Sequence, residues 1–431
     1  MSIKIHTGQI LHFLSAVTHE YFPSGALVTE DGKVVTCGDK ESLLARYPQA
    51  DITDHGERLI MPGMIDSHVH YPQLDVIASY GEQLLDWLNN YTFPAENAFK
   101  DPETGRSTAQ FFLNELLKNG TTTAMVYGTV HPQSVDAFFE QSSALNTRML
   151  CGKVMMDRNA PEYLCDTAES SQTDSQALID RWHKKGRQLY VVTPRFAITS
   201  TPEQLTAAGQ LLKDNPDVYL QTHLAENKAE IAFVEELFPE RKGYLDVYAH
   251  YGLLGPRSTF GHCVHLDDQD LKIMSDTGSR IAFCPTSNLF LGSGLFRLHH
   301  QPSPVSVSIA SDVGGGTSLS MLQTLNEAYK ICQLNGTSLS PLEAFYRVTL
   351  GNAESLLLDD RIGNFTPGKE ADFIVLNPAG TPLMERRSGK CTSLEELLFC
   401  LMIMGDDRAV AATYVMGNCL WNAMTDNEAK P

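Results

Sequence analysis

Eight short apolar runs, spaced through the middle of the chain, restrict this protein to one kind of architecture. Amphipathic, helix-like segments separate most of the runs, for example 107–119, 175–185, 202–213, 228–237 and 319–333. Strand–helix alternation is typical of parallel sheets, and eight such repeats close a (β/α)8 barrel. We therefore predict an α/β protein with a TIM barrel, whose strands lie within 64–70, 122–128, 149–156, 190–196, 219–226, 258–265, 280–287 and 305–313.

The two ends of the chain are similar to each other and differ from the middle. Residues 25–37 hold two β-rich runs joined by Asp31-Gly32, which is a strong hairpin signal. Strand-like runs with glycine punctuation also begin at Pro367 and Thr413. We predict that both ends form one small β-sandwich domain, from residues 1–62 and 366–431, and that residues 63–365 form the barrel.

Charge and apolar content limit the possible partners. The formal net charge is −19, and a field of that sign repels nucleic acid and anionic membranes, so we expect neither as a partner. The longest apolar run, 397–404, is too short to cross a bilayer. No signal peptide is recognisable, and nine scattered cysteines contain no C-x-x-C pair, which indicates reduced thiols in the cytoplasm.

Histidines at the ends of predicted strands carry the strongest chemical signal. His68 and His70 end the first strand, and the two-residue period of a strand places both on one face. A bare H-x-H pair is more often two hydrogen-bonded histidines than a metal site. His223 in the fifth strand and Asp312 at the end of the eighth favour the metal, because all four residues fall at the catalytic end of the barrel. Three imidazoles and a carboxylate suit one zinc ion, with room for water.

Two more residues stand beside this candidate metal site. His262, in the sixth predicted strand, is placed either to ligate the metal or to hydrogen-bond a water on it. Glu226 follows His223 by three residues, so its carboxylate is placed to shuttle a proton between that water and a substrate nitrogen. The alternative is that Glu226 is an acidic residue at a helix N-terminus, favoured there by the helix dipole.

These residues lie in segments that resemble the amidohydrolase superfamily of metal-dependent barrels: LIMPGMIDSHVH (59–70), THLAE (222–226), GHC (261–263), SD (311–312) and PGKEADFIVL (367–376). A second set is similar to the guanine deaminase family within that superfamily: 68–73, 80–94, 192–197, 222–227 and 283–296. The second set includes stretches without any role in the metal shell, so the resemblance extends beyond a metal motif.

The resemblance implies zinc-dependent hydrolysis of guanine to xanthine and ammonia in purine catabolism, with hydroxide attacking C2. One Zn²⁺ per chain would be held by His68, His70, His223 and Asp312. Glu226 would be the proton shuttle, and His262 and Asp312 would deprotonate and aim the water. The purine would be bound by His70, Gln73, Arg195, Phe196, His223, Glu226 and Asp312. Residues 80–93 would cover the pocket, or would simply be an amphipathic helix with Leu84, Leu85 and Leu88 inward.

Metal number, assembly and substrate follow from the same resemblance. Two-metal members of the superfamily carry a modified lysine at the end of the fourth strand, and the corresponding run YVVTPRF has none. One metal is therefore expected, and relatives suggest a homodimer. Two alternatives stay open: a related aminohydrolase for a pterin, a triazine or a modified purine, and a barrel scaffold that no longer catalyses.

Overall fold

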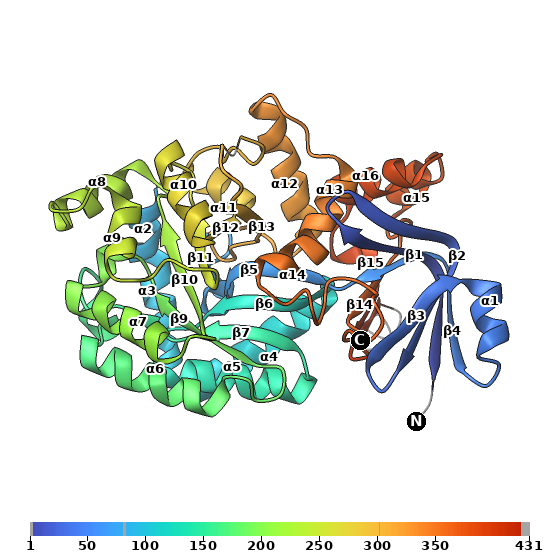
Figure 1. Ribbon diagram of the computed structural model, residues 1–431, viewed down its shortest axis with the longest axis horizontal. Coiled ribbons are helices and arrows are strands. Elements are labelled where there is room, and N and C mark those ends of the chain that lie inside the picture. The colour runs from blue at the N-terminus through green and yellow to red at the C-terminus, as the bar shows by residue number, and fades with distance from the viewer. Residues whose placement is uncertain (1–2, 81–82, 301, 424–431) are drawn as a thin grey trace.

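Eight parallel strands form the barrel that the alternation predicts, in the described residues 3–80, 83–300 and 302–423 of a computed structural model (Figure 1). A ninth short strand, β8 (Val154–Met155), continues the third strand and pairs with the fourth. In sheet order the eight are β5 (Met64–His70), β6 (Thr121–Tyr127), β7 (Arg148–Gly152), β9 (Leu189–Pro194), β10 (Tyr219–Leu224), β11 (Ser258–His262), β12 (Arg280–Phe283) and β13 (Ser306–Ile309).

The first and last strands are joined through side chains and loop atoms. The Asn352 side chain donates hydrogen bonds to the carbonyl oxygens of Ile65 in β5 and Ile309 in β13, at 2.7 and 2.8 Å. Just beyond β13, the backbone N–H of Asp312 donates to the carbonyl oxygen of His68 at 2.9 Å. The closure of the barrel therefore brings Asp312 beside the histidines of β5, although these residues are far apart in sequence.

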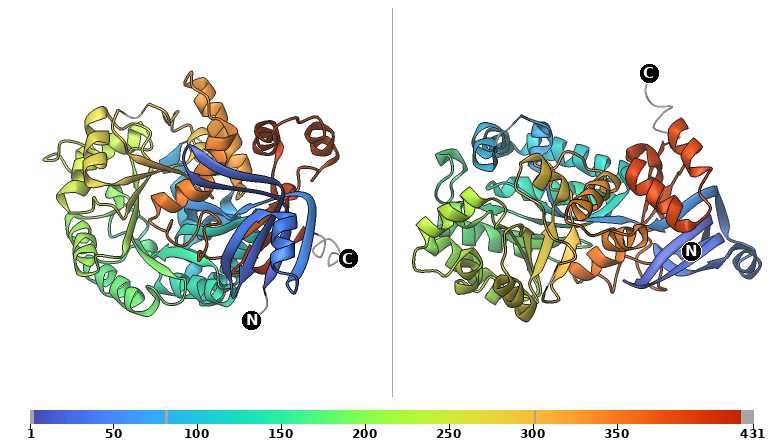
Figure 2. Two further views of the ribbon diagram at one scale, coloured as in Figure 1. Left: turned by 45° about the vertical axis from the view of Figure 1, so that its right-hand side comes forward. Right: turned by 90° about the horizontal axis from the view of Figure 1, so that it is seen from above.

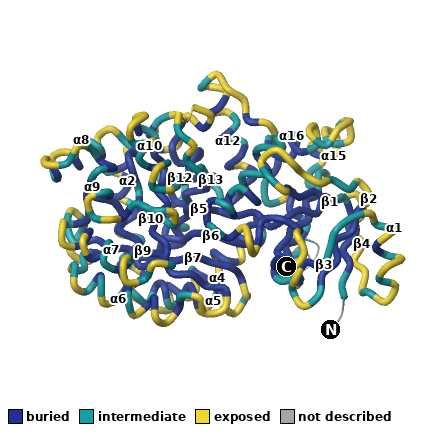
Figure 3. Tube along the Cα trace, viewed as in Figure 1, coloured by how far each residue is buried: buried dark blue, intermediate teal, exposed yellow. Residues whose placement is uncertain are grey.

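Helices cover the outside of the barrel and follow its strands. The larger ones are α4 (Pro102–Lys118), α5 (Pro132–Leu145), α6 (Ala168–Trp182), α7 (Pro202–Asp214), α8 (Lys228–Leu237), α10 (Asp268–Thr277) and α12 (Met321–Leu334). Most begin at a side chain that accepts a hydrogen bond from the first turn, as Asp101, Thr201 and Asp267 do. Figure 3 shows buried strands inside and exposed helix surface outside, so the apolar faces of the helices pack inward.

Both chain ends build a second, mixed sheet beside the barrel, as predicted, and Figure 2 shows the blue and red segments together. Its strand order is β16 (Asn418–Asn422), β15 (Val410–Val415), β14 (Phe373–Leu376), β4 (Asp51–Pro62), β1 (Lys4–Ser15), β2 (Thr18–Glu30) and β3 (Lys33–Asp39). The N-terminal and C-terminal parts meet where β14 runs antiparallel to β4. We propose a domain junction at 62/63, because β4 ends at Pro62, and a second at 365/366.

Shorter helices complete the chain. Beside the mixed sheet lie α1 (Lys40–Arg46), α15 (Pro382–Ser388) and α16 (Leu394–Met404), and the remaining short helices include α9 (Tyr244–His250), α13 (Pro341–Tyr346) and α14 (Asn352–Ser355). The predicted hairpin joins β2 to β3, and both Asp31 and Gly32 have positive φ, at 50° and 77°. Within the described ranges, no helix has the length and apolar character needed to span a bilayer.

A buried network of charges ties the small sheet to the bottom of the barrel. Arg148, which begins β7, donates from Nε to Glu370 Oε2 at 2.7 Å. Arg187 donates from Nη2 to the same oxygen at 2.7 Å and also pairs with Asp372. All four side chains are buried, so removing one partner leaves an uncompensated charge inside the protein.

Replacing Glu370 with glutamine should destabilise the fold in a pH-dependent way. Burial raises the pKa of Glu370, but the hydrogen bonds and charges of Arg148 and Arg187 outweigh burial and lower the pKa from 4.5 to about 2. A carboxylate whose pKa is lower in the folded state adds stability above the unfolded value and loses it as the pH falls. The shift in the pKa of Glu370 corresponds to about 3 kcal/mol. Urea unfolding at pH 7 should therefore give Glu370→Gln a free energy of unfolding that is lower than that of wild type by about this amount.

The same comparison at pH 3 should show a smaller difference between wild type and Glu370→Gln. Asp276→Asn is the matched control, because Asp276 pairs with Lys272 on the exposed side of α10 and should change stability little at either pH. A difference that stays the same at pH 7 and pH 3 would contradict the assigned role of the network.

Candidate metal centre and substrate pocket

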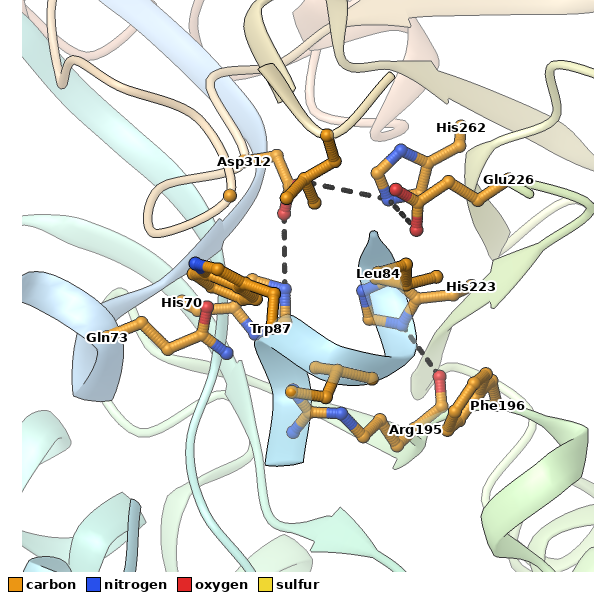
Figure 4. Close-up of a pocket in the computed structure, with 13 residues that line it drawn as sticks. His70, Gln73, Leu84, Trp87, Arg195, Phe196, His223, Glu226, His262 and Asp312 are labelled. Carbon is orange, nitrogen blue, oxygen red and sulfur yellow. Dashed lines mark hydrogen bonds and ion pairs between the residues drawn. The ribbon is translucent and has the colours of Figure 1, made fainter. Parts of the chain in front are cut away.

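Five candidate ligands meet at the carboxyl end of the barrel strands. Figure 4 shows His70, His223, His262 and Asp312 among them. His68 and His70 come from β5, His223 from β10 and His262 from β11, while Asp312 follows β13. One ligand atom from each of His68, His223, His262 and Asp312 lies within 4.8 Å of the others. His70 joins them through Asp312, because His70 Nε2 lies 3.3 Å from Asp312 Oδ1.

The carboxylate of Asp312 is surrounded by imidazole nitrogens. Its Oδ1 lies 3.2 Å from His68 Nε2, and its Oδ2 lies 3.5 Å from His262 Nε2. Both nitrogens are buried, and neither has a hydrogen-bond partner within the described part of the chain. Buried nitrogens without partners that converge on one carboxylate indicate a place for a cation. Without a cation, the fold would bear the energetic cost of several unsatisfied buried polar atoms.

The protonation states favour metal binding as well. Burial lowers the pKa of His70 to about 3 and, with the neighbouring histidines, places the pKa of His223 well below its usual value. Burial raises the pKa of Asp312, but His262, His68 and His70 outweigh it and hold the pKa well below the usual range. His70 and His223 therefore offer neutral imidazoles and Asp312 a carboxylate, which are the forms that ligate divalent cations.

Hydrogen bonds behind the ligands orient two of the rings. His223 Nδ1 is 2.7 Å from the carbonyl oxygen of Arg195, and His262 Nδ1 is 2.8 Å from Asn288 Oδ1. Since both oxygens accept, each Nδ1 carries the proton, which leaves Nε2 of each ring free to face the centre. Sequence reasoning missed Asn288, on α11 (Pro285–Phe290), although it lies inside the 283–296 segment that carries the family resemblance.

A buried carboxylate that the sequence analysis also missed anchors the loop carrying Asp312. Asp66 accepts hydrogen bonds from the backbone and hydroxyl of Ser311 and from the backbone of His68. Burial raises the pKa of Asp66 to about 6, against these hydrogen bonds. Its position two residues before His68, within the same strand, was the available signal.

The backbone turns sharply where the ligands sit. His262 and Asp312 have φ values of 68° and 51°, in the left-handed region that non-glycine residues rarely occupy. Gly261 is needed for a different reason, because a Cβ there would lie 2.6 Å from Cε1 of His68. The ring of His68 in β5 thus packs directly against the backbone of β11 at Gly261.

The side chain of Glu226 faces the cavity and does not cap a helix. The N-terminus of α8 is capped by Asn227, and Glu230 accepts from the backbone N–H groups of Glu226 and Asn227. Glu226 Oε2 instead lies 3.4 Å from His262 Nε2, and Oε1 accepts from the Ser293 hydroxyl at 2.9 Å. Burial, reinforced by the charge of Asp312, raises the pKa of Glu226 to about 8, so this carboxyl group can carry a proton at neutral pH.

A cavity of about 390 Å³ opens directly onto this centre. Its polar wall includes Gln73 and Arg195, and Phe196 lies beside them, so the structure brings together every site residue that the sequence predicts. The remaining walls are largely apolar: Leu84, Trp87, Leu88, Leu291 and Gly315.

The predicted covering segment lies over the cavity. Of residues 80–93, Gly81 and Glu82 lie outside the described residues, and the remainder includes α2 (Leu84–Trp87) and the π-helix η2 (Leu88–Thr92). Leu84 and Leu88 point inward as an amphipathic helix requires, and the same side chains line the cavity. Leu85, which was also expected to face inward, is only half-buried, so Leu84 and Leu88 are the residues that agree with both interpretations of this segment.

A TIM barrel with buried histidines and an aspartate at its strand ends defines the class of metal-dependent barrel hydrolases. The model of the amidohydrolase family matches residues 59–420. Guanine deaminase of Escherichia coli (strain K12) is 54% identical over 403 residues, covering 93% of this chain and 92% of that protein.

Solved structures of guanine deaminases also match the fold of this chain. The E. coli guanine deaminase structure matches with a TM-score of 0.96 and 51% identity, over 97% of this chain and 100% of that one. A guanine deaminase from C. acetobutylicum with guanine bound in its active site matches with a TM-score of 0.89 and 28% identity, over 97% and 100%. The chain belongs to the amidohydrolase family, and within it to the group of the guanine deaminases.

Proposed function

We propose that this enzyme hydrolyses guanine to xanthine and ammonia. The observation that carries the proposal is one cavity bordered by a cluster of metal-ligating side chains, by a carboxyl group that can hold a proton at neutral pH, and by the guanidinium of Arg195. The similarity to guanine deaminases, one of them solved with guanine bound, supports the same substrate.

The donor set fits one zinc ion per chain. His68, His70, His223 and Asp312 would be its ligands, because imidazole nitrogens and a carboxylate oxygen are donor atoms that zinc accepts. A zinc ion bound there would lower the pKa of a water molecule to about 7 and would so make hydroxide available near neutral pH.

The side chains around the cavity then divide the remaining work. His262 and Asp312 accept hydrogen bonds from the water and aim it at C2 of the purine. Glu226 donates its proton to a ring nitrogen, N3, which makes C2 more electrophilic. As the water oxygen adds to C2, Glu226 takes one proton from that water. The C2–N bond then breaks, Glu226 passes this proton to the departing amine, and the remaining proton of the hydroxyl group at C2 returns to Glu226. The atoms balance as guanine plus water giving xanthine plus ammonia.

The purine is held by a mixture of polar and apolar walls. Arg195 is a charged donor for a carbonyl oxygen of the ring, and Gln73 offers both a donor and an acceptor. Phe196 and Trp87 give flat apolar surfaces for a planar solute. Guanine is neutral, so the net charge of −19 does not oppose its binding.

Ammonia release with a panel of aminated heterocycles tests this assignment. We expect guanine to be preferred over adenine, cytosine and aminotriazines by about 10- to 100-fold in rate, because a buried donor without its acceptor costs binding energy. Metal content is measured on the same sample. A preference for adenine or cytosine would overturn the assignment, and no ammonia release from a metal-loaded sample would favour the scaffold.

We further propose a cytoplasmic homodimer that acts in purine catabolism. All nine cysteines are free thiols, which supports a reducing compartment. The homodimer and the metabolic role rest on the family resemblance.

A further inference from the structure

Glu96 is a buried carboxylate behind the wall of the pocket. It lies on α3 (Phe93–Asn97), at the end of the segment that covers the cavity, and its exposed fraction is 0%. It is not among the residues that line the cavity. The reaction steps described above give it no part, yet a carboxylate without any exposure must be compensated by specific partners.

Those partners are the two polar side chains assigned to the purine. Arg195 donates from Nη1 to both oxygens of Glu96, at 2.9 and 3.0 Å. Gln73 donates from Nε2 to Glu96 Oε1 at 2.9 Å. Glu96 therefore connects the 3-10 helix η1 (Tyr71–Val76), which follows β5 and carries Gln73, with the loop after β9, which carries Arg195.

The contacts of Arg195 leave one edge of its guanidinium for the cavity. Among the described residues, hydrogen bonds from this side chain run only from Nη1 to Glu96. The ring of Phe93, one turn before Glu96 on α3, lies 5.4 Å from the guanidinium carbon. Glu96 thus binds one nitrogen of the guanidinium and the ring of Phe93 packs against it, while Nε and Nη2 stay available as a planar fork.

The same carboxylate sets the direction of the Gln73 amide. Gln73 Oε1 accepts from the backbone N–H of Gly314 at 3.3 Å, while Nε2 donates to Glu96. A flipped amide would face the N–H of Gly314 with its own N–H groups and the carboxylate with its oxygen, so both contacts would become repulsive. The acceptor at position 96 and the backbone N–H of Gly314 together keep the amide in its present direction.

We infer that Glu96 is a positioning residue for substrate specificity, which acts through Arg195 and Gln73 on the carbonyl edge of the purine. The inference rests on the proposed function and deepens it. A guanidinium fork pairs with the adjacent 6-oxo and N7 acceptors of a guanine-type base. Glu96 neutralises Arg195 and fixes its plane, so ligands that carry the 6-oxo group depend on Glu96 and ligands that lack it do not.

The test uses two unreactive purines as inhibitors of the metal-loaded enzyme. Hypoxanthine carries the 6-oxo group, whereas purine itself does not. In Glu96→Gln, the inhibition constant of hypoxanthine and KM for guanine should each rise about 10- to 100-fold, the usual effect of losing a supporting hydrogen-bond partner. The inhibition constant of purine should change by less than about threefold, and kcat should fall less than KM rises.

Two further variants complete the experiment. Glu103→Gln, the control, removes an exposed partner of Arg106 on α4 and should change neither constant. Glu96→Asp keeps the charge and should give a smaller change in the same direction. This variant replaces Glu96→Gln in the test if Glu96→Gln folds poorly. Equal loss of both inhibitors, or an unchanged constant for hypoxanthine, overturns the inference. If wild type releases no ammonia from guanine, the proposed function fails separately, and direct titration with the two purines still tests Glu96.

Discussion

Replacing Glu226 with glutamine should lower kcat/KM for guanine by about 10²- to 10⁴-fold, the usual contribution of a general acid–base group. Glutamine has almost the same shape, and its carbonyl oxygen can still accept from the Ser293 hydroxyl. It cannot carry the proton that N3 and the departing amine need. Steady-state ammonia release measures the loss, while metal content and thermal unfolding should stay close to wild type.

The control for this variant is Glu235→Gln. Glu235 lies on the exposed side of α8, a short distance along the chain from Glu226, and its neutralisation should leave turnover unchanged. Turnover near the wild-type level in Glu226→Gln would remove this residue from the reaction.

Replacing Asp312 with asparagine should lower both metal content and activity. The carboxylate faces nitrogens of His68, His70 and His262, and is the only negative ligand in the assigned shell. Asparagine keeps the shape and loses the charge, so the cation binds more weakly, and the activity should fall by at least about 10³-fold when its chemistry is lost. Elemental analysis of the purified protein and ammonia release measure the two effects.

Chelation of the wild-type protein provides the matching comparison. Activity should disappear on dialysis against a chelator and return when zinc is added, whereas Asp312→Asn should not recover under the same conditions. Asp268→Asn, on the exposed N-terminal turn of α10, should behave as wild type throughout. Full activity of the chelated, metal-free enzyme would contradict the assignment of the centre.

Much of the fold could be predicted because it follows local rules. Buried parallel strands appear as continuous apolar runs, and amphipathic helices separate them, so all eight barrel strands could be located within a few residues. The candidate metal ligands could be recognised for the same reason, since His68, His70 and His223 lie at or near the ends of such runs. The general architecture of the family then predicts that these ends meet.

The supporting side chains could not be found in this way. Glu96 contacts Arg195, Asn288 contacts His262, and Asp66 contacts Ser311, and these pairs are separated by 99, 26 and 245 positions along the chain. No local pattern distinguishes these residues from ordinary polar residues of loops and helices. Only packing of the folded chain shows which of them are buried and which partner each one meets.

The sequence alone determined the class of fold and the kinds of ligand, because strand periodicity and residue chemistry are properties of short segments. Tertiary structure alone decided that Glu226 faces the cavity and holds a proton at neutral pH, and that Nε2 of His262 points at the centre. Protonation and ring orientation depend on burial, on nearby charge and on hydrogen bonds from distant segments, and these arise only when the barrel closes.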